Sequence, residues 1–306
     1  MFKNDKLIGH NNTFKNLIDL FNKNSLPNKI LLSGKKGIGK SILAEHLINY
    51  IYSLSENDKY DIDNLIINKN NRSNILYNNN SHPNIFKIIK NDEKKKIEIS
   101  QIREMIDFQN KSSFNNKIKT IIIDEINYLN LNSTNALLKS LEEPKQGTLF
   151  ILINNSDEYI SDTIKSRCIE FKLFINFEET TLIVNNYYQE NIIKNISHDF
   201  LNYYNSPSFF ISLIKFMKEN NIDYNTATIE DLLIFLIKNK LYMTNKFIVQ
   251  NLNNFIELFF YKNINHKKNN SHIIKEYFYF KLKQIQKYNL DFESFFLEFQ
   301  DRLLSE

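Results

Sequence analysis

Cysteine, proline and glycine are all scarce in this sequence of 306 residues, and the scarcity of cysteine excludes two kinds of structure. Cys168 is the one cysteine, so no disulfide can form within the chain. The six histidines are scattered and have no second cysteine to complete a zinc site. We therefore expect no zinc and a reducing compartment, which indicates the cytoplasm.

Long apolar runs are missing too, although 42% of the residues are hydrophobic and 24% are charged, as in globular proteins. No apolar run approaches the 18 or so residues that span a bilayer, and the N-terminal segment MFKNDKLIGHNN has no apolar signal core. A soluble, unprocessed protein is expected. The net charge of +4 at pH 7 permits contact with nucleic acid but does not imply it.

Three of the five glycines lie within GKKGIGKS, residues 34 to 41, which fits the phosphate-loop pattern G-x-x-x-x-G-K-[ST]. The apolar run NKILLSG before it predicts a buried strand, and SILAEHLINYIY after it predicts a helix. Gly34, Gly37 and Gly39 would let backbone N–H groups converge on phosphate oxygens. Lys40 would reach the β and γ phosphates, and Ser41 would bind Mg²⁺.

A second strand ends in two carboxylates, in the segment TIIIDE. Asp124 would bind Mg²⁺ through water, and Glu125 would act as a general base that orients the attacking water. Two acidic residues at the end of a strand are common and do not by themselves indicate a site. Together with the glycine loop they predict a nucleotide site.

Segments around these motifs alternate between strand and helix patterns up to about residue 175, which predicts an α/β fold with a parallel sheet and helices on both faces. Residues 56–81 are rich in asparagine, and we expect an exposed excursion there. Beyond residue 175 the chain is predicted to be helical. Thr228 and Asp231 form a predicted capping box, and an aromatic stripe predicts helix packing: Phe292, Phe295, Phe296, Phe299 and Leu303.

Arginine is scarce as well, with four residues in a chain that otherwise uses lysine. One of them, Arg167, lies in the segment IKSRC. Its planar guanidinium suits the equatorial oxygens of a phosphoryl group in transition, so it is a candidate arginine finger. A surface ion pair is the alternative for this residue, and Cys168 beside it is expected to be a small buried apolar group.

The motifs GKKGIGKS, IIIDE, NALLKSLEEP, LFILINN and TIKSRC, in that order, resemble the AAA+ clamp-loader subunits of bacterial DNA polymerase III. The resemblance implies an AAA+ P-loop domain at 1–174, a small helical lid at 175–221 and a helical collar at 222–306. It also implies ATP or ADP with Mg²⁺, and a hetero-oligomeric ring of clamp-loader subunits that opens a sliding clamp and loads it on primed DNA during replication.

The same resemblance gives roles to further residues by position. Asn155, or less favourably Asn154, matches the polar sensor at a strand end. Arg167 matches the finger, which in this family reaches into the ATP site of a neighbouring subunit. Arg103 and Lys139 match positions that face duplex DNA, where phosphate contacts hold the duplex without reading its sequence.

Within the family, HPNIF at 82–86, EISQIRE at 98–104 and a single collar favour the delta-prime type, with a gamma/tau-like motor as the alternative. Hydrolysing members have a four-cysteine zinc module and a second sensor arginine. This chain has no such cysteines, and between Arg167 and Arg302 it offers only lysine, such as Lys215. We expect an ATP-binding subunit of a polymerase holoenzyme whose own ATPase is weak or absent. A P-loop kinase of small molecules and a scaffold with a vestigial site are more distant alternatives.

Overall fold

The computed structural model describes residues 5–90, 96–201, 205–263, 271–288 and 290–304. The chain divides into two compact units. The first comprises Met1–Ile183 together with Ser206–Ser208, and the second comprises Val184–Asn205 and Phe209–Glu306.

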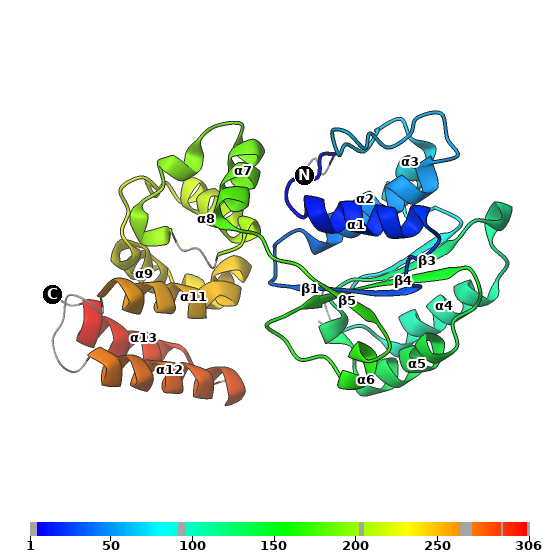
Figure 1. The fold of residues 1–306 in the computed structure, drawn as a ribbon. Helices are drawn as coiled ribbons and strands as arrows, with labels where there is room; N and C mark the ends of the chain where they lie inside the picture. The colour runs from blue at the N-terminus through cyan, green and yellow to red at the C-terminus, as the bar shows by residue number, and fades with distance from the viewer. Residues whose placement is uncertain (1–4, 91–95, 202–204, 264–270, 289, 305–306) are drawn as a thin grey trace. The chain divides into compact units, whose positions relative to one another are not determined.

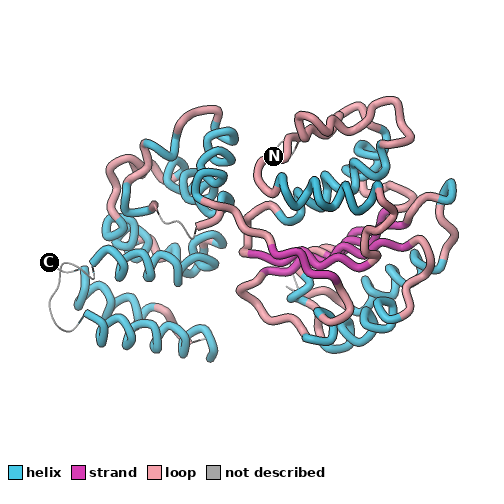
Figure 2. Tube along the Cα trace, viewed as in Figure 1, coloured by secondary structure: helices cyan, strands magenta, loops and turns pink. Residues whose placement is uncertain are grey.

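A parallel five-stranded sheet forms the centre of the first unit and is drawn in magenta in Figure 2. Its strand order is β2-β3-β4-β1-β5. The central strands are fully buried, which is why they appear in the sequence as continuous apolar runs. Strand β4 lies between β1 and β3, so the ends of these three strands meet at one edge of the sheet. The strands are β1 (Lys29–Gly34), β2 (Ile85–Ile88), β3 (Lys119–Ile123), β4 (Thr148–Asn155) and β5 (Ile169–Lys172).

Helices cover both faces of this sheet, as the sequence predicts (Figure 1). One face packs against α1 to α3, through a core that includes Phe14, Leu47 and Ile151. The other packs against α4 to α6, through a core that includes Ile102, Leu137 and Phe150. The helices are α1 (Asn11–Asn22), α2 (Lys40–Ser53), α3 (Arg72–Asn78), α4 (Ile99–Asn110), α5 (Leu131–Glu142) and α6 (Asp162–Lys165).

The expectation of an exposed excursion at residues 56–81 is wrong in part. Tyr60, Leu65 and Ile67 are buried in the core beside α2. Asn71 is fully buried and caps α3, because its side-chain oxygen accepts from the N–H of Asn74 at 2.7 Å. These apolar residues are widely spaced among polar ones and follow neither helical nor strand periodicity. The sequence pattern therefore does not reveal that they are buried.

Helices make up the second unit, as predicted for the chain beyond residue 175. The capping box of Thr228 and Asp231 begins α9, and the predicted aromatic stripe is confirmed as packing, since Phe295, Phe296 and Phe299 are buried. The helices are α7 (Phe177–Tyr188), which crosses the boundary between the units, α8 (Pro207–Glu219), α9 (Ile229–Lys238), α10 (Leu241–Thr244), α11 (Lys246–Asn263), α12 (Ser271–Tyr288) and α13 (Glu293–Phe299).

Two further findings concern membrane-spanning helices and the boundary between the two units. No helix among them combines the length and the apolar character that crossing a bilayer requires. The boundary between the two compact units falls between residues 183 and 184. The boundaries expected near residues 174 and 221, which separate the P-loop domain, the lid and the collar, remain predictions.

Candidate functional site

The loop between β1 and α2 has a backbone that only glycine adopts easily. Gly37 and Gly39 have φ values of 80° and 90°, in the left-handed region. Gly34 is needed for space, because an added Cβ would lie 2.6 Å from the carbonyl oxygen of Leu173. Gly39 is also the N-cap of α2, where backbone N–H groups have no partner within the helix. The loop is therefore a concave set of backbone donors at a helix N-terminus, which suits an anion.

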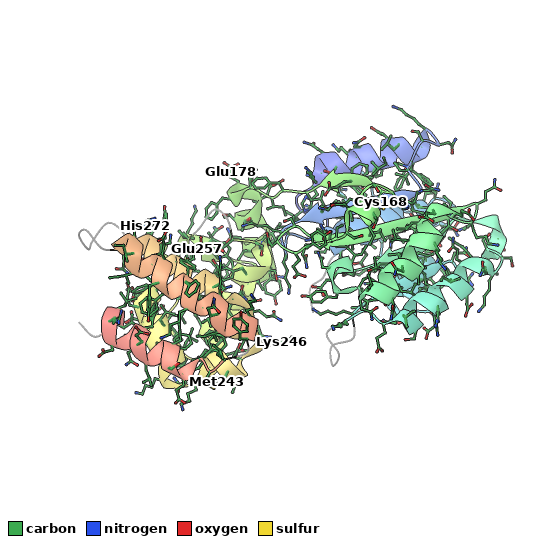
Figure 3. All side chains as sticks on the ribbon, turned by 90° about the horizontal axis from the view of Figure 1, so that it is seen from below. Cys168, Glu178, Met243, Lys246, Glu257 and His272 are labelled. Atoms are coloured by element: carbon green, nitrogen blue, oxygen red, sulfur yellow. The ribbon has the colours of Figure 1, made fainter. Side chains whose placement is uncertain are left out.

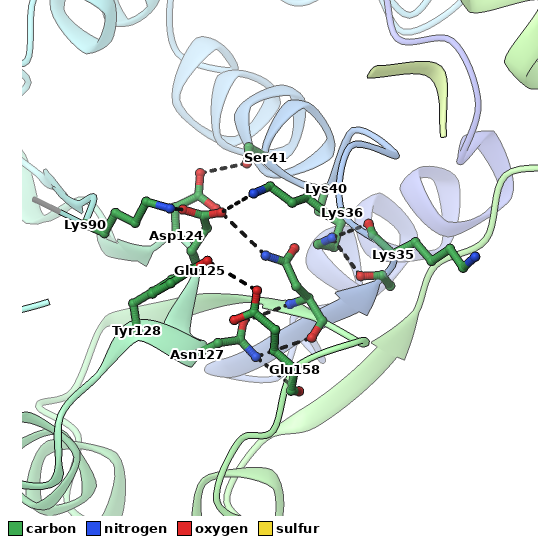
Figure 4. Close-up of polar contacts among 12 residues, drawn as sticks. Lys35, Lys36, Lys40, Ser41, Lys90, Asp124, Glu125, Asn127, Tyr128 and Glu158 are labelled. Carbon is green, nitrogen blue, oxygen red and sulfur yellow. Dashed lines mark hydrogen bonds and ion pairs between the residues drawn. The ribbon is translucent and has the colours of Figure 1, made fainter. Parts of the chain in front are cut away.

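Lys40 lies on this loop with its ammonium group turned back onto it (Figure 4). Its Nζ donates to the carbonyl oxygens of Gly34 and Lys35, at 2.8 and 2.6 Å. Burial lowers the pKa of Lys40 to about 8, although attraction to Asp124 opposes the change. A buried ammonium that donates its hydrogen bonds to neutral carbonyls gains from an anionic acceptor, which is what a phosphate provides.

Ser41 and Asp124 meet across the site. The Ser41 hydroxyl donates to Oδ2 of Asp124 at 2.8 Å, so the two predicted metal ligands are adjacent. Among the described residues no group of three histidine, cysteine or acidic side chains could hold a metal ion unaided. Mg²⁺ commonly takes one or two protein oxygens and completes its shell with water and phosphate, so this pair fits Mg²⁺ bound together with a nucleotide.

Glu125 follows Asp124 in a left-handed conformation, with φ of 55°. Its carboxylate is held by two lysines, with Lys90 Nζ at 3.0 Å and Lys36 Nζ at 3.9 Å. Burial lowers the pKa of Lys90, but the hydrogen bond and attraction to Glu125 outweigh it and leave that pKa above its ordinary value. Lys90 also lies over the ring of Tyr128, 4.1 Å from its centroid. In this conformation the proposed general base is engaged in an ion pair.

The two candidate sensor residues at the end of β4 differ in what they face. The Asn155 amide donates to Glu125 Oε1 at 3.5 Å, whereas the Asn154 amide donates to the Ser33 hydroxyl at 3.4 Å. Asn155 is thus the one beside the carboxylate. Asn127 was missed by the sequence analysis: it accepts from the Asn155 N–H at 3.0 Å and donates to Asn154 Oδ1 at 2.6 Å. The sequence offered one sign of Asn127, which is a polar residue that stands between Ile126 and Tyr128 directly after the acidic pair.

Arg167 lies away from this loop, at the opposite edge of the sheet. It comes two residues before Ile169, which pairs with Ile30 near the start of β1, while the loop follows the end of β1. The four residue steps from Ile30 to Gly34 span roughly 13 Å of strand, so the register places the backbone of Arg167 beyond the start of β1 and the loop beyond its end. Within its own chain it donates to Glu142 Oε1 at 2.5 Å and to the Thr163 carbonyl at 2.9 Å.

Cys168, labelled in Figure 3, is half-buried and packs against the core shared by α4, α5 and α6. Burial raises the pKa of its thiol to about 11, although Lys29 nearby opposes the change. The thiol is therefore protonated at neutral pH and unreactive, in agreement with the prediction of an apolar role.

The remaining predicted residues lie elsewhere. Arg103 on α4 and Lys139 on α5 are both exposed, on two helices that pack together on one face of the sheet. Lys215 belongs to the second unit, and its Nζ is 3.7 Å from Glu219 Oε1. Upstream of Lys215 on the same helix α8, Ser208 belongs to the first unit, and its N–H donates to the Gly37 carbonyl at 3.3 Å.

Comparison with known proteins gives a family model described as DNA polymerase III, delta subunit, which matches residues 9–176. The DNA polymerase III subunit gamma of Buchnera aphidicola subsp. Schizaphis graminum is 32% identical over 174 residues, 57% of this chain and 46% of the relative. The delta' subunit of the same organism is 31% identical over 183 residues, 58% of this chain and 53% of the relative. The chain thus spans about half the length of these curated relatives.

Among solved structures, a DNA polymerase III gamma subunit-related protein from Thermotoga maritima covers 93% of this chain and 96% of its own, with a TM-score of 0.55. The two sequences are 15% identical, so the likeness concerns the fold. It shows that the two chains share a fold, in which a parallel α/β sheet is followed by a helical region, as the sequence predicts.

Proposed function

Because the chain belongs to the family described as DNA polymerase III, delta subunit, we propose that it is a subunit of the bacterial clamp loader. In this role it takes part in the ATP-dependent loading of a sliding clamp on primed DNA. Its partners are a delta subunit and gamma/tau subunits in a hetero-oligomeric ring in the cytoplasm, together with the clamp. The exposed Arg103 and Lys139 contact DNA phosphates.

The loop at residues 34–41 binds ATP or ADP with Mg²⁺. Lys40 and the loop N–H groups hold the phosphates, and Ser41 and Asp124 hold the metal. Mg²⁺ supplies positive charge beside the phosphate oxygens when it is bound. The 2.8 Å contact between Ser41 and Asp124, next to the glycine loop, supports this assignment.

Hydrolysis in the chain's own site is weak or absent. The carboxylate of Glu125 is engaged by Lys90 at 3.0 Å, and the second unit contains no arginine before Arg302 that could serve as a second sensor. A lysine such as Lys215 is a point charge and reproduces the bidentate fork poorly.

Arg167 serves the site of a neighbouring subunit. The observation that carries this proposal is the position of Arg167 at the edge of the sheet opposite the phosphate loop, because the length of β1 separates it from the loop of its own chain. An arginine finger supplied in trans is worth about 10³ to 10⁵ in rate. One side chain can therefore couple the assembly of the ring to hydrolysis.

A gamma/tau-like motor that hydrolyses ATP in its own site is the second candidate. The 32% identity to a gamma subunit favours it, and this value is close to the 31% identity to a delta' subunit of the same organism. Such a motor would turn over ATP when purified alone and would lose this turnover on Glu125→Gln.

The test of the proposal is copurification of the full chain with gamma/tau and delta subunits, followed by measurement of the DNA-stimulated ATPase. Arg167→Ala is expected to leave the complex assembled and to lower turnover by at least about 10³ at each site that Arg167 completes. Arg72→Ala, which removes a different arginine of the first unit, one that is exposed, is the control and should leave the rate unchanged. An undiminished rate in the assembled Arg167→Ala complex would rule the proposal out.

A further inference from the structure

A buried histidine lies directly before α1, outside every site considered so far. His10 has only 7% of its surface exposed and is the N-cap of α1 with φ of 59° and ψ of 16°. Gly9 before it is also left-handed, with φ of 79°. A residue other than glycine in this region carries a conformational cost of about 1 kcal/mol or more, and such residues cluster at functional sites. We therefore expect a contact of the His10 side chain that offsets the conformational cost of this turn.

That contact is with the phosphate loop. Nε2 of His10 lies 2.8 Å from the carbonyl oxygen of Ile38. Because a carbonyl can only accept, Nε2 carries the hydrogen and donates. The bond joins two segments 28 residues apart, and both partners are shielded from water.

The position of Ile38 makes this bond consequential. Ile38 stands between Gly37 and Gly39, which both have positive φ and no side chain to restrict them. In a planar trans peptide the carbonyl oxygen and the next N–H point in opposite directions. A histidine that holds the oxygen of Ile38 therefore also fixes the direction of the Gly39 N–H, on the side away from His10.

We propose that His10 is a positioning residue for phosphate binding, because it orients the peptide between Ile38 and Gly39 so that the Gly39 N–H points at the bound phosphate. This inference rests on the proposed nucleotide binding by the loop. It assigns a function to a segment, residues 9 and 10, that no motif in the sequence marks.

Two substitutions separate this role from a general role in folding. In His10→Gln the amide nitrogen occupies a place similar to Nε2 and can still donate to Ile38. In His10→Asn the side chain is polar and tolerates the left-handed backbone, but it is too short to reach. With ADP and Mg²⁺ as the probe, calorimetric titration of the full chain should give an affinity about tenfold weaker for His10→Asn. His10→Gln should stay within about threefold of the original protein.

A second readout reports on the Gly39 N–H itself. Only Gly9 and Gly39 follow an isoleucine, so ¹⁵N-glycine with ¹³C-carbonyl isoleucine selects two amide signals, and Gly9→Asn identifies the first. A new hydrogen bond to phosphate moves an amide proton downfield. ADP should move the Gly39 signal downfield in the original protein and in His10→Gln, and much less in His10→Asn. Loss of stability alone would not change this signal.

The outcomes are distinct. If folded His10→Asn keeps the affinity and the Gly39 shift, or folded His10→Gln loses both, the inference is overturned while nucleotide binding stands. If the original protein binds no ADP, the proposed nucleotide site fails and the inference falls with it. Thermal unfolding of each variant identifies any that do not fold, and the comparison of His10→Gln with the original protein then decides alone.

Discussion

At the scale of single residues, the sequence predicts those site residues that lie in continuous motifs and misses those that reach the site from elsewhere. Ser41 and Asp124 were predicted, and the structure brings them into contact. Asn127 and Lys90 each contact the site through one side chain in a segment with no characteristic spacing. Pattern alone cannot reveal such residues, because their role depends on which strands become neighbours in the sheet.

Lys40 gives a prediction about pH. Its pKa is lowered by burial to about 8, and an anionic phosphate favours the ammonium form, so nucleotide binding above pH 8 requires uptake of a proton. The affinity for ADP should therefore fall as pH rises from about 8, by up to about tenfold per pH unit. Calorimetric titration between about pH 7 and about pH 9.5 measures this. Lys40→Arg, which stays charged, is the control and should bind with little dependence on pH. A flat profile in the original protein would contradict the prediction.

His82 gives a prediction about stability. It is buried, and its Nδ1 accepts from the Asn84 N–H at 3.2 Å, which requires the neutral ring. Burial lowers the pKa of His82 from 6.5 to about 4, with a further lowering from Lys117 that Glu56 opposes. The unfolded chain thus binds the proton more readily. Above pH 6.5 the ring is neutral in both states and His82 costs no stability. As pH falls from 6.5 toward 4, the free energy of unfolding decreases by at most about 3 kcal/mol, because the unfolded chain takes up the proton first.

The measurement for His82 is urea unfolding at several pH values between about 7 and about 4. His82→Asn keeps an acceptor oxygen near the place of Nδ1 and cannot titrate, so its free energy of unfolding should fall less over this interval. Equal slopes for the two proteins would show that His82 does not contribute, since other groups titrate alike in both.

At the scale of helices and strands, the sequence predicts the elements that are long and fully buried. Strands β1, β3 and β4 and helices α2, α4 and α5 all follow patterns recognised in advance. Strand β2, which has four residues at one edge of the sheet, was predicted from the apolar run at residues 85–90. Strand β5 has the same length and lies at the other edge, but it was missed because it is largely exposed and has no continuous apolar run. Helix α1 was missed although Phe14, Leu17 and Ile18 are buried at helical spacing, since its polar start carries no N-cap side-chain bond.

The phosphate loop gives a prediction at this scale. Gly37 and Gly147 share a left-handed backbone, with φ of 80° and 75°, but differ in their surroundings. A Cβ added to Gly37 would lie 2.6 Å from the Ser208 Cβ, whereas one added to Gly147 would meet nothing within 4 Å. Gly147→Ala should cost about 1 kcal/mol of stability from backbone strain, and Gly37→Ala should cost more and weaken ADP binding. Thermal unfolding and titration check both, and equal costs would contradict the role of space at Gly37.

At the scale of the whole molecule, the sequence predicts an α/β part followed by a helical part, and each is present. The finer division into lid and collar is harder to infer, because the helical part has one proline, Pro207, and no glycine to mark its boundaries. The choice between delta-prime and gamma/tau is equally hard from likeness alone. Both kinds of relative match about 57% or 58% of the chain, at nearly equal identity.

The roles of Arg167 and Glu125 distinguish a delta-prime-like subunit from a gamma/tau-like motor better than sequence identity does. A delta-prime-like subunit contributes Arg167 to a neighbour and makes little use of its own Glu125, whereas a motor depends on Glu125 in its own site. The location of Arg167 at the sheet edge opposite the phosphate loop, and the ion pair of Glu125 with Lys90, both favour the first.

The most direct measurement is therefore the DNA-stimulated ATPase rate of the reconstituted complex in which only this chain is changed, with Arg167→Ala compared against Glu125→Gln. Our account predicts a loss of at least about 10³ for each site that Arg167 completes, and little change for Glu125→Gln. A large loss with Glu125→Gln and none with Arg167→Ala, in complexes that assemble equally well, would contradict it.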